Sequence, residues 1–385
     1  MTQSEVIYLD NNSTTPVDPA VVEAMLPYFA SKFGNPSNPA HDYGLEALRA
    51  VEHARFQVAS LIGGESKEIV FTSGATESNN LAVLGAARGS RGRGNHVITT
   101  VIEHRAVLNP CRQLEREGMA VTYLPVDTRG RVSVDDLANA VTQGTVLVSV
   151  MAANNEVGTI QPIREIGRVC KERGILFHSD AVQALGKVPL NVEDFGVDLL
   201  SISGHKMYGP KGVGALFVRS RDPTVELEPI VHGGGQELGL RSGTVAVPGV
   251  VALGAACELA EGHLATESSR LRTLRNRLFE LISIAIPAAI VHGPEANGLP
   301  GLLNLGFPGI DGDDLINCLK GVAVSQGSSC SARSFEPSYV LRALGIGDEL
   351  ARASIRIGVG RFTTASEVDE AAKRIIAAVQ MLQHA

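Results

Sequence analysis

The chain has 385 residues, of which 44% are hydrophobic and 19% are charged, and its formal net charge at pH 7 is -7. This composition excludes a disordered or fibrous protein, and the negative charge offers no general attraction to nucleic acid or anionic lipid. The chain begins without a recognisable secretory signal, and its most apolar window, residues 245–257, is too short to span a membrane. We therefore expect a cytoplasmic protein with no membrane and no direct nucleic-acid partner.

Seven short apolar runs, each followed by a polar turn and most by a helical stretch, fill the chain between about residues 68 and 218. The runs are EIVFTS, HVITTVIEH, VTYLPV, TVLVSVMAANNE, ILFHSD, LLSISGH and GALFVR. Nearly continuous apolar strands separated by helical crossovers are typical of a mostly parallel sheet with helices on both faces. The sequence therefore predicts an α/β fold built on a seven-stranded sheet.

Polar residues cluster directly after several of these predicted strands. Because ligands of parallel sheets bind at the carboxyl ends of the strands, we expect one functional site at that edge. The clusters are Ser73-Gly74-Ala75-Thr76, Glu103-His104, Asn154-Asn155, Asp180 with Gln183, and Ser203-His205-Lys206.

After about residue 261 the pattern changes to a charged helix and short alternating strands such as GLLNLGF and SIRIGVGRF. Single cores rarely grow beyond about 250–300 residues, so this change is interpreted as a second, smaller α+β domain. The predicted large domain covers residues 16–261, and the predicted small domain combines residues 1–15 with residues 262–385.

The segment FTSGATESNN predicts a strand, a glycine turn and a helix that begins near Thr76. Exposed N–H groups and the positive end of the helix dipole favour an anion such as phosphate there, and Thr76 adds a hydroxyl donor. Taken alone, ordinary helix capping is the simpler interpretation. The chain has no G-x-x-x-x-G-K-[ST] motif, so a nucleotide P-loop is not supported.

Asp180 and Lys206 are the candidate residues for cofactor chemistry. Asp180 ends an otherwise apolar strand, and a partly buried carboxylate needs a partner such as a protonated pyridine ring. Lys206 lies between two apolar strands, where poor solvation lowers the pKa of a lysine and favours Schiff-base chemistry. The alternatives are a helix-capping aspartate and a surface lysine, with Lys211 as the competing lysine in a solvated GPKG turn.

His104 and Arg356 are further candidates at strand positions. His104 ends a predicted strand, where an imidazole can lie against a cofactor ring and move protons near neutral pH. Arg356 alternates with isoleucines, so its fork is available to hold a carboxylate. The alternatives are a helix-capping histidine and a surface arginine.

Cys330 differs from the other four cysteines, which lie in or beside helical apolar patterns and are expected to be inert core residues. Residues 326–334 show no apolar periodicity, which predicts an exposed, mobile loop that carries a reactive thiol. Arg333 is positioned in sequence to favour the thiolate. The odd number of cysteines and the absence of a C-x-x-C pair favour neither disulfides nor a structural zinc site, so no metal is expected.

The chain resembles the cysteine desulfurases, pyridoxal-phosphate enzymes of fold type I, and within them the group whose active-site cysteine lies on a long loop. The resemblance runs almost end to end, through YLDNNSTTPVDP, TSGATESNN, EHRAV, NNEVGTIQPI, HSDAVQALGK, SGHKMYGPKGVGAL, GGGQELGLRSGT, GSSCSARSFEPSYVLRALG and SIRIGVGRFTT. It implies an enzyme that converts L-cysteine to L-alanine and receives the sulfur on Cys330 as a persulfide.

The resemblance also implies roles for individual residues. Lys206 carries pyridoxal 5'-phosphate, Asp180 contacts the pyridine nitrogen, and Gln183 lies at the ring hydroxyl. His104 stacks on the ring and acts with Lys206 and Cys330 in catalysis. The remaining implied contacts are Ala75, Thr76, Ser203 and His205 at the cofactor, Thr244 from the partner subunit of a homodimer at the phosphate, and Asn155 and Arg356 at the substrate, with Arg356 on its carboxylate.

The resemblance leaves the sulfur acceptor open. The chain stops soon after AAKRIIAAVQMLQHA, without the longer tail that contacts the iron–sulfur scaffold protein in housekeeping members, so cluster assembly or another thiolation pathway are both compatible. A related aminotransferase, a selenocysteine lyase and a non-catalytic binding protein are the rival functions, and Cys330 is the residue that separates them.

Overall fold

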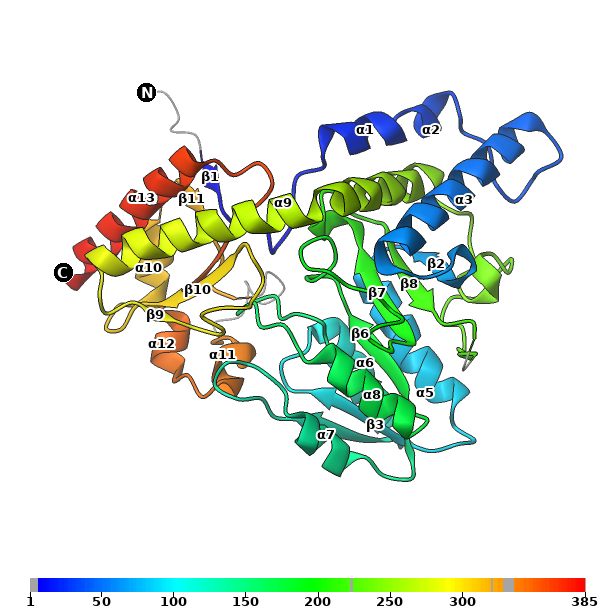
Figure 1. Ribbon diagram of the computed structural model, residues 1–385, viewed down its shortest axis with the longest axis horizontal. Coiled ribbons are helices and arrows are strands. Elements are labelled where there is room, and N and C mark those ends of the chain that lie inside the picture. The colour runs from blue at the N-terminus through cyan, green and yellow to red at the C-terminus, as the bar shows by residue number, and fades with distance from the viewer. Residues whose placement is uncertain (1–5, 222–223, 320, 328–335, 385) are drawn as a thin grey trace.

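The computed structural model describes residues 6–221, 224–319, 321–327 and 336–384, so Cys330 and its loop lie outside the described residues. Its centre is a seven-stranded sheet in the order β2-β8-β7-β6-β5-β3-β4 (Figure 1). Only β8 runs antiparallel to its neighbours, so the prediction of a mostly parallel seven-stranded sheet is confirmed. The strands are β2 (Ile69–Thr72), β3 (His96–Thr100), β4 (Ala120–Leu124), β5 (Thr145–Ser149), β6 (Leu176–Asp180), β7 (Leu199–Ser203) and β8 (Gly214–Val218).

Helices cover both faces of this sheet. One face packs against α3 (Asp42–Ile62), α7 (Val134–Ala140), α8 (Ile163–Glu172) and the first part of α9 (Val247–Ala285). The other face packs against α6 (Arg105–Arg116) and a continuous helical segment made of α4 (Ala75–Asn80), the π-helical turn η2 (Leu81–Gly85) and α5 (Ala86–Gly89).

The alternation of side chains along a strand explains why both faces are apolar. In β2, Ile69 and Phe71 belong to the first core, whereas Val70 between them belongs to the second. Successive side chains of a strand point to opposite faces, so a strand buried on both sides needs a continuous apolar run. Several polar residues within the strands are buried and paired with one another, as His178 is with Ser149 and Ser201.

A separate core gathers the C-terminal elements. Its antiparallel sheet has the order β12-β10-β9, and β1 (Ile7–Tyr8) pairs in parallel with β11 (Val322–Ala323) beside it. The strands are β9 (Ile290–Val291), β10 (Leu302–Gly306) and β12 (Ser354–Gly358), and the helices of this core are α10 (Gly312–Cys318) and α13 (Ala365–Gln383). The helices α11 (Tyr339–Ala343) and α12 (Asp348–Arg352) pack in a smaller cluster with Ile102, Met151 and Val157. The helix α9 runs unbroken past residue 261 and packs against both α3 and α13 (Figure 1).

The N-terminal segment connects the two cores. After β1 it passes the carboxyl edge of the large sheet, then forms α1 (Pro19–Met25) and α2 (Pro27–Ala30). Short 3-10 turns complete the list of elements: η1 (Ser66–Glu68), η3 (Gly204–Lys206) and η4 (Glu237–Gly239). The division into residues 16–261 and residues 1–15 with 262–385 remains a proposal, which the separate hydrophobic cores support.

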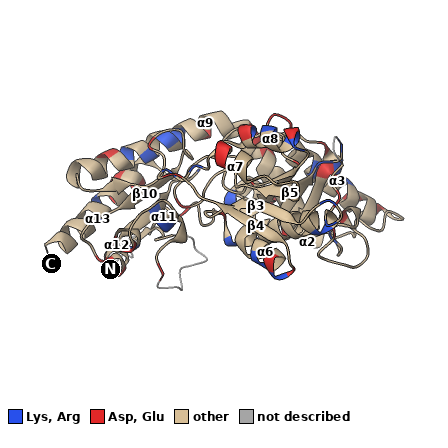
Figure 2. Cartoon of the chain, turned by 90° about the horizontal axis from the view of Figure 1, so that it is seen from below, with Lys and Arg blue, Asp and Glu red and all other residues tan. Residues whose placement is uncertain are grey.

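Charged side chains lie on the outer helices, and both signs are mixed on α9 and α6 (Figure 2). The described part of the chain contains no helix whose length and hydropathy together would let it cross a bilayer.

Candidate active site

A cavity of about 430 Å³ lies at the carboxyl ends of β2, β3, β5, β6 and β7. Parallel strands end at the same edge of a sheet, so residues far apart in sequence meet there. Among the predicted site residues that the structure describes, all except Thr244 line this cavity: Ala75, Thr76, His104, Asn155, Asp180, Gln183, Ser203, His205, Lys206 and Arg356. Thr244 is exposed and lies outside the cavity.

The turn between β2 and α4 forms one wall of the cavity. Gly74 has φ 143° and ψ -179°, a conformation that is open essentially to glycine alone. Ser73, Gly74, Ala75 and Thr76 thereby face the cavity at the start of the helical segment, where unpaired N–H groups favour an anion. The turn is braced by Glu77, which accepts hydrogen bonds from the Ser73 backbone at 2.8 Å and from Arg241 Nε at 2.9 Å.

Asp180 is the last residue of β6 and is buried. Its Oδ2 accepts a hydrogen bond from Nδ2 of Asn79 at 2.7 Å, and its Oδ1 accepts one from the backbone of Val182 at 3.0 Å. The second contact closes a turn after β6, where the structure has no helix to cap, so the alternative of a helix-capping aspartate is wrong. Asp180 lines the cavity. Both donors are neutral, so the carboxylate keeps its charge available for a cationic ligand.

Lys206 ends the turn η3, directly after β7. Its Nζ donates to the backbone oxygens of Asn12 at 2.8 Å and Ser13 at 2.5 Å. Thr15 fixes the same turn, because its backbone and its hydroxyl both donate to the carbonyl of His205, at 3.0 and 3.1 Å. The competing lysine, Lys211, is exposed at the rim of the cavity.

Gln183 is held by a set of contacts that the sequence did not reveal. Its Oε1 accepts from Asn12 Nδ2 at 2.9 Å and from Lys187 Nζ at 3.0 Å, and its Nε2 donates to the Asn12 carbonyl at 2.9 Å. Because a backbone carbonyl only accepts, the contact with the Asn12 carbonyl fixes which end of the amide is the nitrogen. Asn12, Ser13 and Lys187 were missed as site residues, although the polar run DNNSTT after the apolar start of the chain was a signal for the first two.

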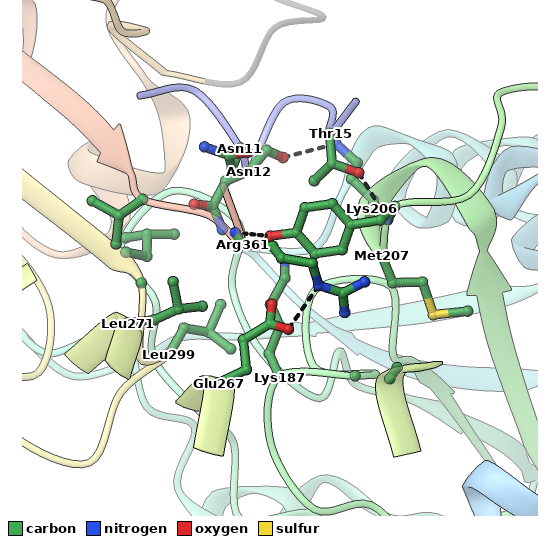
Figure 3. Close-up of a pocket in the computed structure, with 16 residues that line it drawn as sticks. Asn11, Asn12, Thr15, Lys187, Lys206, Met207, Glu267, Leu271, Leu299 and Arg361 are labelled. Atoms are coloured by element: carbon green, nitrogen blue, oxygen red, sulfur yellow. Dashed lines mark hydrogen bonds and ion pairs between the residues drawn. The ribbon is translucent and has the colours of Figure 1, made fainter. Parts of the chain in front are cut away.

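A second cavity of about 20 Å³ shares Asn12 and Lys206 with the first and is lined by Lys187 (Figure 3). Burial, followed by the positive charges of Lys206 and Arg356, lowers the pKa of Lys187 to about 7. Lys187 is half-buried and lines this small cavity. Little water reaches its ammonium there, which agrees with the lowered pKa.

The two histidines of the site differ in their surroundings. His104 caps α6, with Nδ1 accepting from the backbone of Ala106 at 3.1 Å, and its ring lines the cavity. Its capping role and its site position, posed as alternatives from the sequence, are therefore compatible. Burial and the charges of nearby lysines lower the pKa of His205 to about 4, so its ring is neutral at pH 7.

Glu103, next to His104, is completely buried, and its Oε1 accepts from Thr100 Oγ1 and from the Met151 backbone, both at 2.9 Å. Burial, with a smaller contribution from the charge of Asp180, raises the pKa of Glu103 to about 8. The carboxyl group is consequently neutral at pH 7.

Arg356 is buried rather than on the surface, since 1% of its side chain is exposed. Its Nη2 forms an ion pair with Asp10 at 2.8 Å, and its Nη1 donates to the backbone carbonyl of Asn155 at 3.1 Å. The alternative of a surface arginine is therefore wrong. The guanidinium reaches the cavity from β12, so the C-terminal core contributes to the site.

The fold and this site define a class of protein. The family model described as Aminotransferase class-V matches residues 7–371, which is nearly the whole chain. Cysteine desulfurase IscS from Rickettsia typhi is 51% identical over 377 residues, covering 98% of this chain and 92% of the relative. The chain therefore belongs to the class-V aminotransferase family and, within it, to the cysteine desulfurases.

Solved structures give the same result. A NifS-like protein superposes with a TM-score of 0.91 at 41% identity, covering 98% of this chain and 100% of that one. The structure described as SspA in complex with cysteine superposes with a TM-score of 0.82 at 40% identity, covering 93% and 99%. The predicted family, fold class and enzymatic nature are confirmed.

Pyridoxal phosphate is the cofactor of this family, as predicted, and the residues present fit it. The cavity offers a lysine amine, a buried carboxylate with neutral partners and a turn of backbone N–H groups, which suit an aldehyde, a pyridinium and a phosphate respectively.

Proposed function

We propose that this protein is a cysteine desulfurase that converts L-cysteine to L-alanine and transfers the sulfur to Cys330 as a persulfide. The observation that supports the proposal most strongly is that Lys206, Asp180 and Arg356 line one cavity, although Asp180 ends β6, Lys206 follows β7 and Arg356 lies within β12 of the smaller sheet. The relative described in complex with cysteine supports L-cysteine as the substrate.

The geometry of the cavity supports a set of proposed cofactor contacts. Lys206 would hold the cofactor through its amine, and the carboxylate of Asp180 would hold the ring nitrogen. Gln183 offers a hydrogen of Nε2 to the ring hydroxyl, because its Oε1 is occupied by Asn12 and Lys187. His104 stacks on the ring, while Ala75, Thr76, Ser203 and the neutral His205 surround the phosphate.

When bound, pyridoxal phosphate supplies an electron sink that acidifies the Cα–H bond of an attached amino acid. The amine of Lys206 would accept this proton on Nζ. Nδ1 of His104 accepts from the Ala106 backbone, so the ring proton lies on Nε2, which is the atom proposed to pass protons in the cavity. Arg356 and Asn155 hold the substrate.

Cys330 acts as the nucleophile in the sulfur step. Its thiolate bonds to the substrate sulfur, the carbon–sulfur bond breaks, and the electron pair stays with Cβ, which takes up a proton to become the methyl group of alanine. The sum is L-cysteine plus a Cys330 thiol giving L-alanine plus a Cys330 persulfide. No external oxidant is needed.

Several finer points belong to the same proposal. The exposed Thr244 reaches the phosphate of the partner subunit, which makes the enzyme a homodimer. The protein works in the cytoplasm, since the described cysteines are free thiols and such chemistry suits a reducing compartment. The persulfide passes to an acceptor protein, such as an iron–sulfur scaffold in cluster assembly or a protein of another thiolation pathway.

The proposal is tested by measuring alanine and sulfide from L-cysteine with a thiol reductant, in cofactor-loaded wild type, Cys330→Ala and Lys206→Ala proteins. We expect both products in the wild type alone, with cofactor still bound by Cys330→Ala. Products from Cys330→Ala at the wild-type rate would contradict the proposal. Absence of alanine from the wild type would instead favour transamination, or selenocysteine lyase activity if selenocysteine were cleaved.

A further inference from the structure

Two nitrogens of the Arg356 guanidinium are held by the protein. Nη2 is paired with Asp10 and Nη1 donates to the Asn155 carbonyl, whereas Nε is buried and has no hydrogen-bond partner among the described residues. Each Nη carries a second N–H beyond the bond named for it. Arg356 lines the cavity, so a carboxylate of the substrate is the acceptor that fits its guanidinium.

Asp10 is itself fixed from the opposite side. Its Oδ2 accepts from Ser325 Oγ at 2.8 Å, while Oδ1 holds Arg356. The backbones interlock as well, because Ser325 and Arg356 exchange hydrogen bonds at 3.2 and 2.6 Å, and Gly358 donates to the Leu9 carbonyl at 2.7 Å. Asp10 therefore cannot leave the guanidinium without disturbing three segments of the chain.

The site stays attractive to an anion despite the carboxylate of Asp10. Lys206, Lys211 and Arg356 line the cavity, against the carboxylates of Glu77 and Asp180, and Glu77 is already paired with Arg241. The carboxylate of Asp10 offsets only part of the remaining positive charge. Its main effect is on geometry, since a planar guanidinium held at two nitrogens has one remaining orientation.

We propose that Asp10 is a positioning residue that orients Arg356 for the α-carboxylate of the amino-acid substrate, so that the site favours amines that carry a carboxylate over amines that lack one. This inference rests on the proposed function. Ser325 supports Asp10 in this role through the hydrogen bond to Oδ2.

The test compares two amines that differ in the carboxylate, L-alanine and ethylamine. Their dissociation constants are measured in cofactor-loaded protein from the change in cofactor absorption, for the wild type, Asp10→Ala and Asp10→Asn. We expect Asp10→Ala to weaken L-alanine binding by roughly tenfold or more, with ethylamine unchanged. Asp10→Asn should restore most of the affinity, because its side-chain oxygen still accepts from Nη2.

Equal weakening of both amines, or no weakening of L-alanine binding, would overturn the inference. If Asp10→Ala fails to fold, Ser325→Ala takes its place, with a smaller loss expected for L-alanine and none for ethylamine. Failure of the proposed function is recognised separately, because L-alanine binding does not need Cys330. If Asp10→Ala weakened L-alanine binding selectively but the wild type formed no alanine from L-cysteine, the desulfurase activity alone would be refuted.

Discussion

Asn79 donates a hydrogen bond from Nδ2 to Oδ2 of Asp180 at 2.7 Å, and both side chains are buried although 101 positions separate them in the chain. Asn79 lies in α4, the helix that follows the proposed phosphate turn. One short helix therefore supports both ends of the proposed cofactor site. This contact positions the carboxylate that we propose to hold the pyridine nitrogen.

Replacing Asn79 by alanine should weaken cofactor binding. A hydrogen bond to a charged group contributes about 1.5–3 kcal/mol, so we expect the dissociation constant of pyridoxal phosphate to rise by roughly tenfold or more. Fluorescence titration of cofactor-free protein measures it. Asn109→Ala, at an exposed position in α6, is the matched control. Identical titration curves for the two variants would show that Asn79 does not support the site.

Lys187 should make stability depend on pH. Its pKa is about 7 in the folded protein and ordinarily 10.5, so between these values the unfolded chain binds the proton that the folded chain has lost. Stability contributed at this position therefore rises with pH across that window, with a slope of up to about 1.4 kcal/mol per pH unit, and is constant below it. Urea unfolding of cofactor-free wild type and Lys187→Met measures the difference.

We expect the free energy of unfolding of Lys187→Met to fall relative to that of the wild type as the pH increases from 7 to 10. Lys373→Met, at an exposed position in α13, should run parallel to the wild type over the same range. A pH-independent difference for Lys187→Met would mean that its ammonium is hydrated in the folded protein.

Glu103 should show the opposite dependence. Its pKa is about 8 in the folded protein and ordinarily 4.5, so between these values the folded protein keeps a proton that the unfolded chain releases. Wild-type stability at this position falls as the pH rises through the window. Glu103→Gln cannot titrate and keeps an oxygen for Thr100 and Met151, so it should match the wild type near pH 5 and exceed it at pH 9. Parallel curves would contradict a neutral Glu103.

The ion pair between Arg55 and Glu237 should stabilise the edge of the sheet. The two groups form paired bonds of 2.8 and 2.9 Å, and Glu237 also accepts from the Phe71 backbone of β2 at 2.7 Å. Glu237→Ala leaves a buried guanidinium without its partner, so we expect a loss of about 3–5 kcal/mol in urea unfolding. Adding Arg55→Met should recover part of that loss. A double variant as unstable as the sum of both single variants would mean that the pair does not act as a unit.

The sequence was sufficient to predict the central sheet because its strands contain apolar runs and all but the edge strand β4 are buried along their whole length. It was also sufficient to place Asp180, His104 and Lys206 at one edge, since parallel strands bring their ends together. These are properties of local pattern and of topology.

The supporting residues were beyond such patterns. Asn79 and Lys187 are polar residues within or just after helical stretches, which on periodicity alone are typical of a surface. Asp10 precedes Arg356 by 346 positions and Asn12 precedes Gln183 by 171, and no spacing encodes a contact between segments so far apart. The burial of Arg356 depends on the N-terminal segment, which places Asp10 beside its guanidinium.

The most direct test of the account is the mass of the peptide that contains Cys330, measured after L-cysteine is added to cofactor-loaded enzyme without a reductant. We predict one additional sulfur atom on Cys330 and one alanine formed per modified site, with no extra sulfur on the peptides of Cys111, Cys170, Cys257 or Cys318. Extra sulfur on one of those four cysteines, or alanine formed at the wild-type rate by Cys330→Ser, would contradict transfer through Cys330.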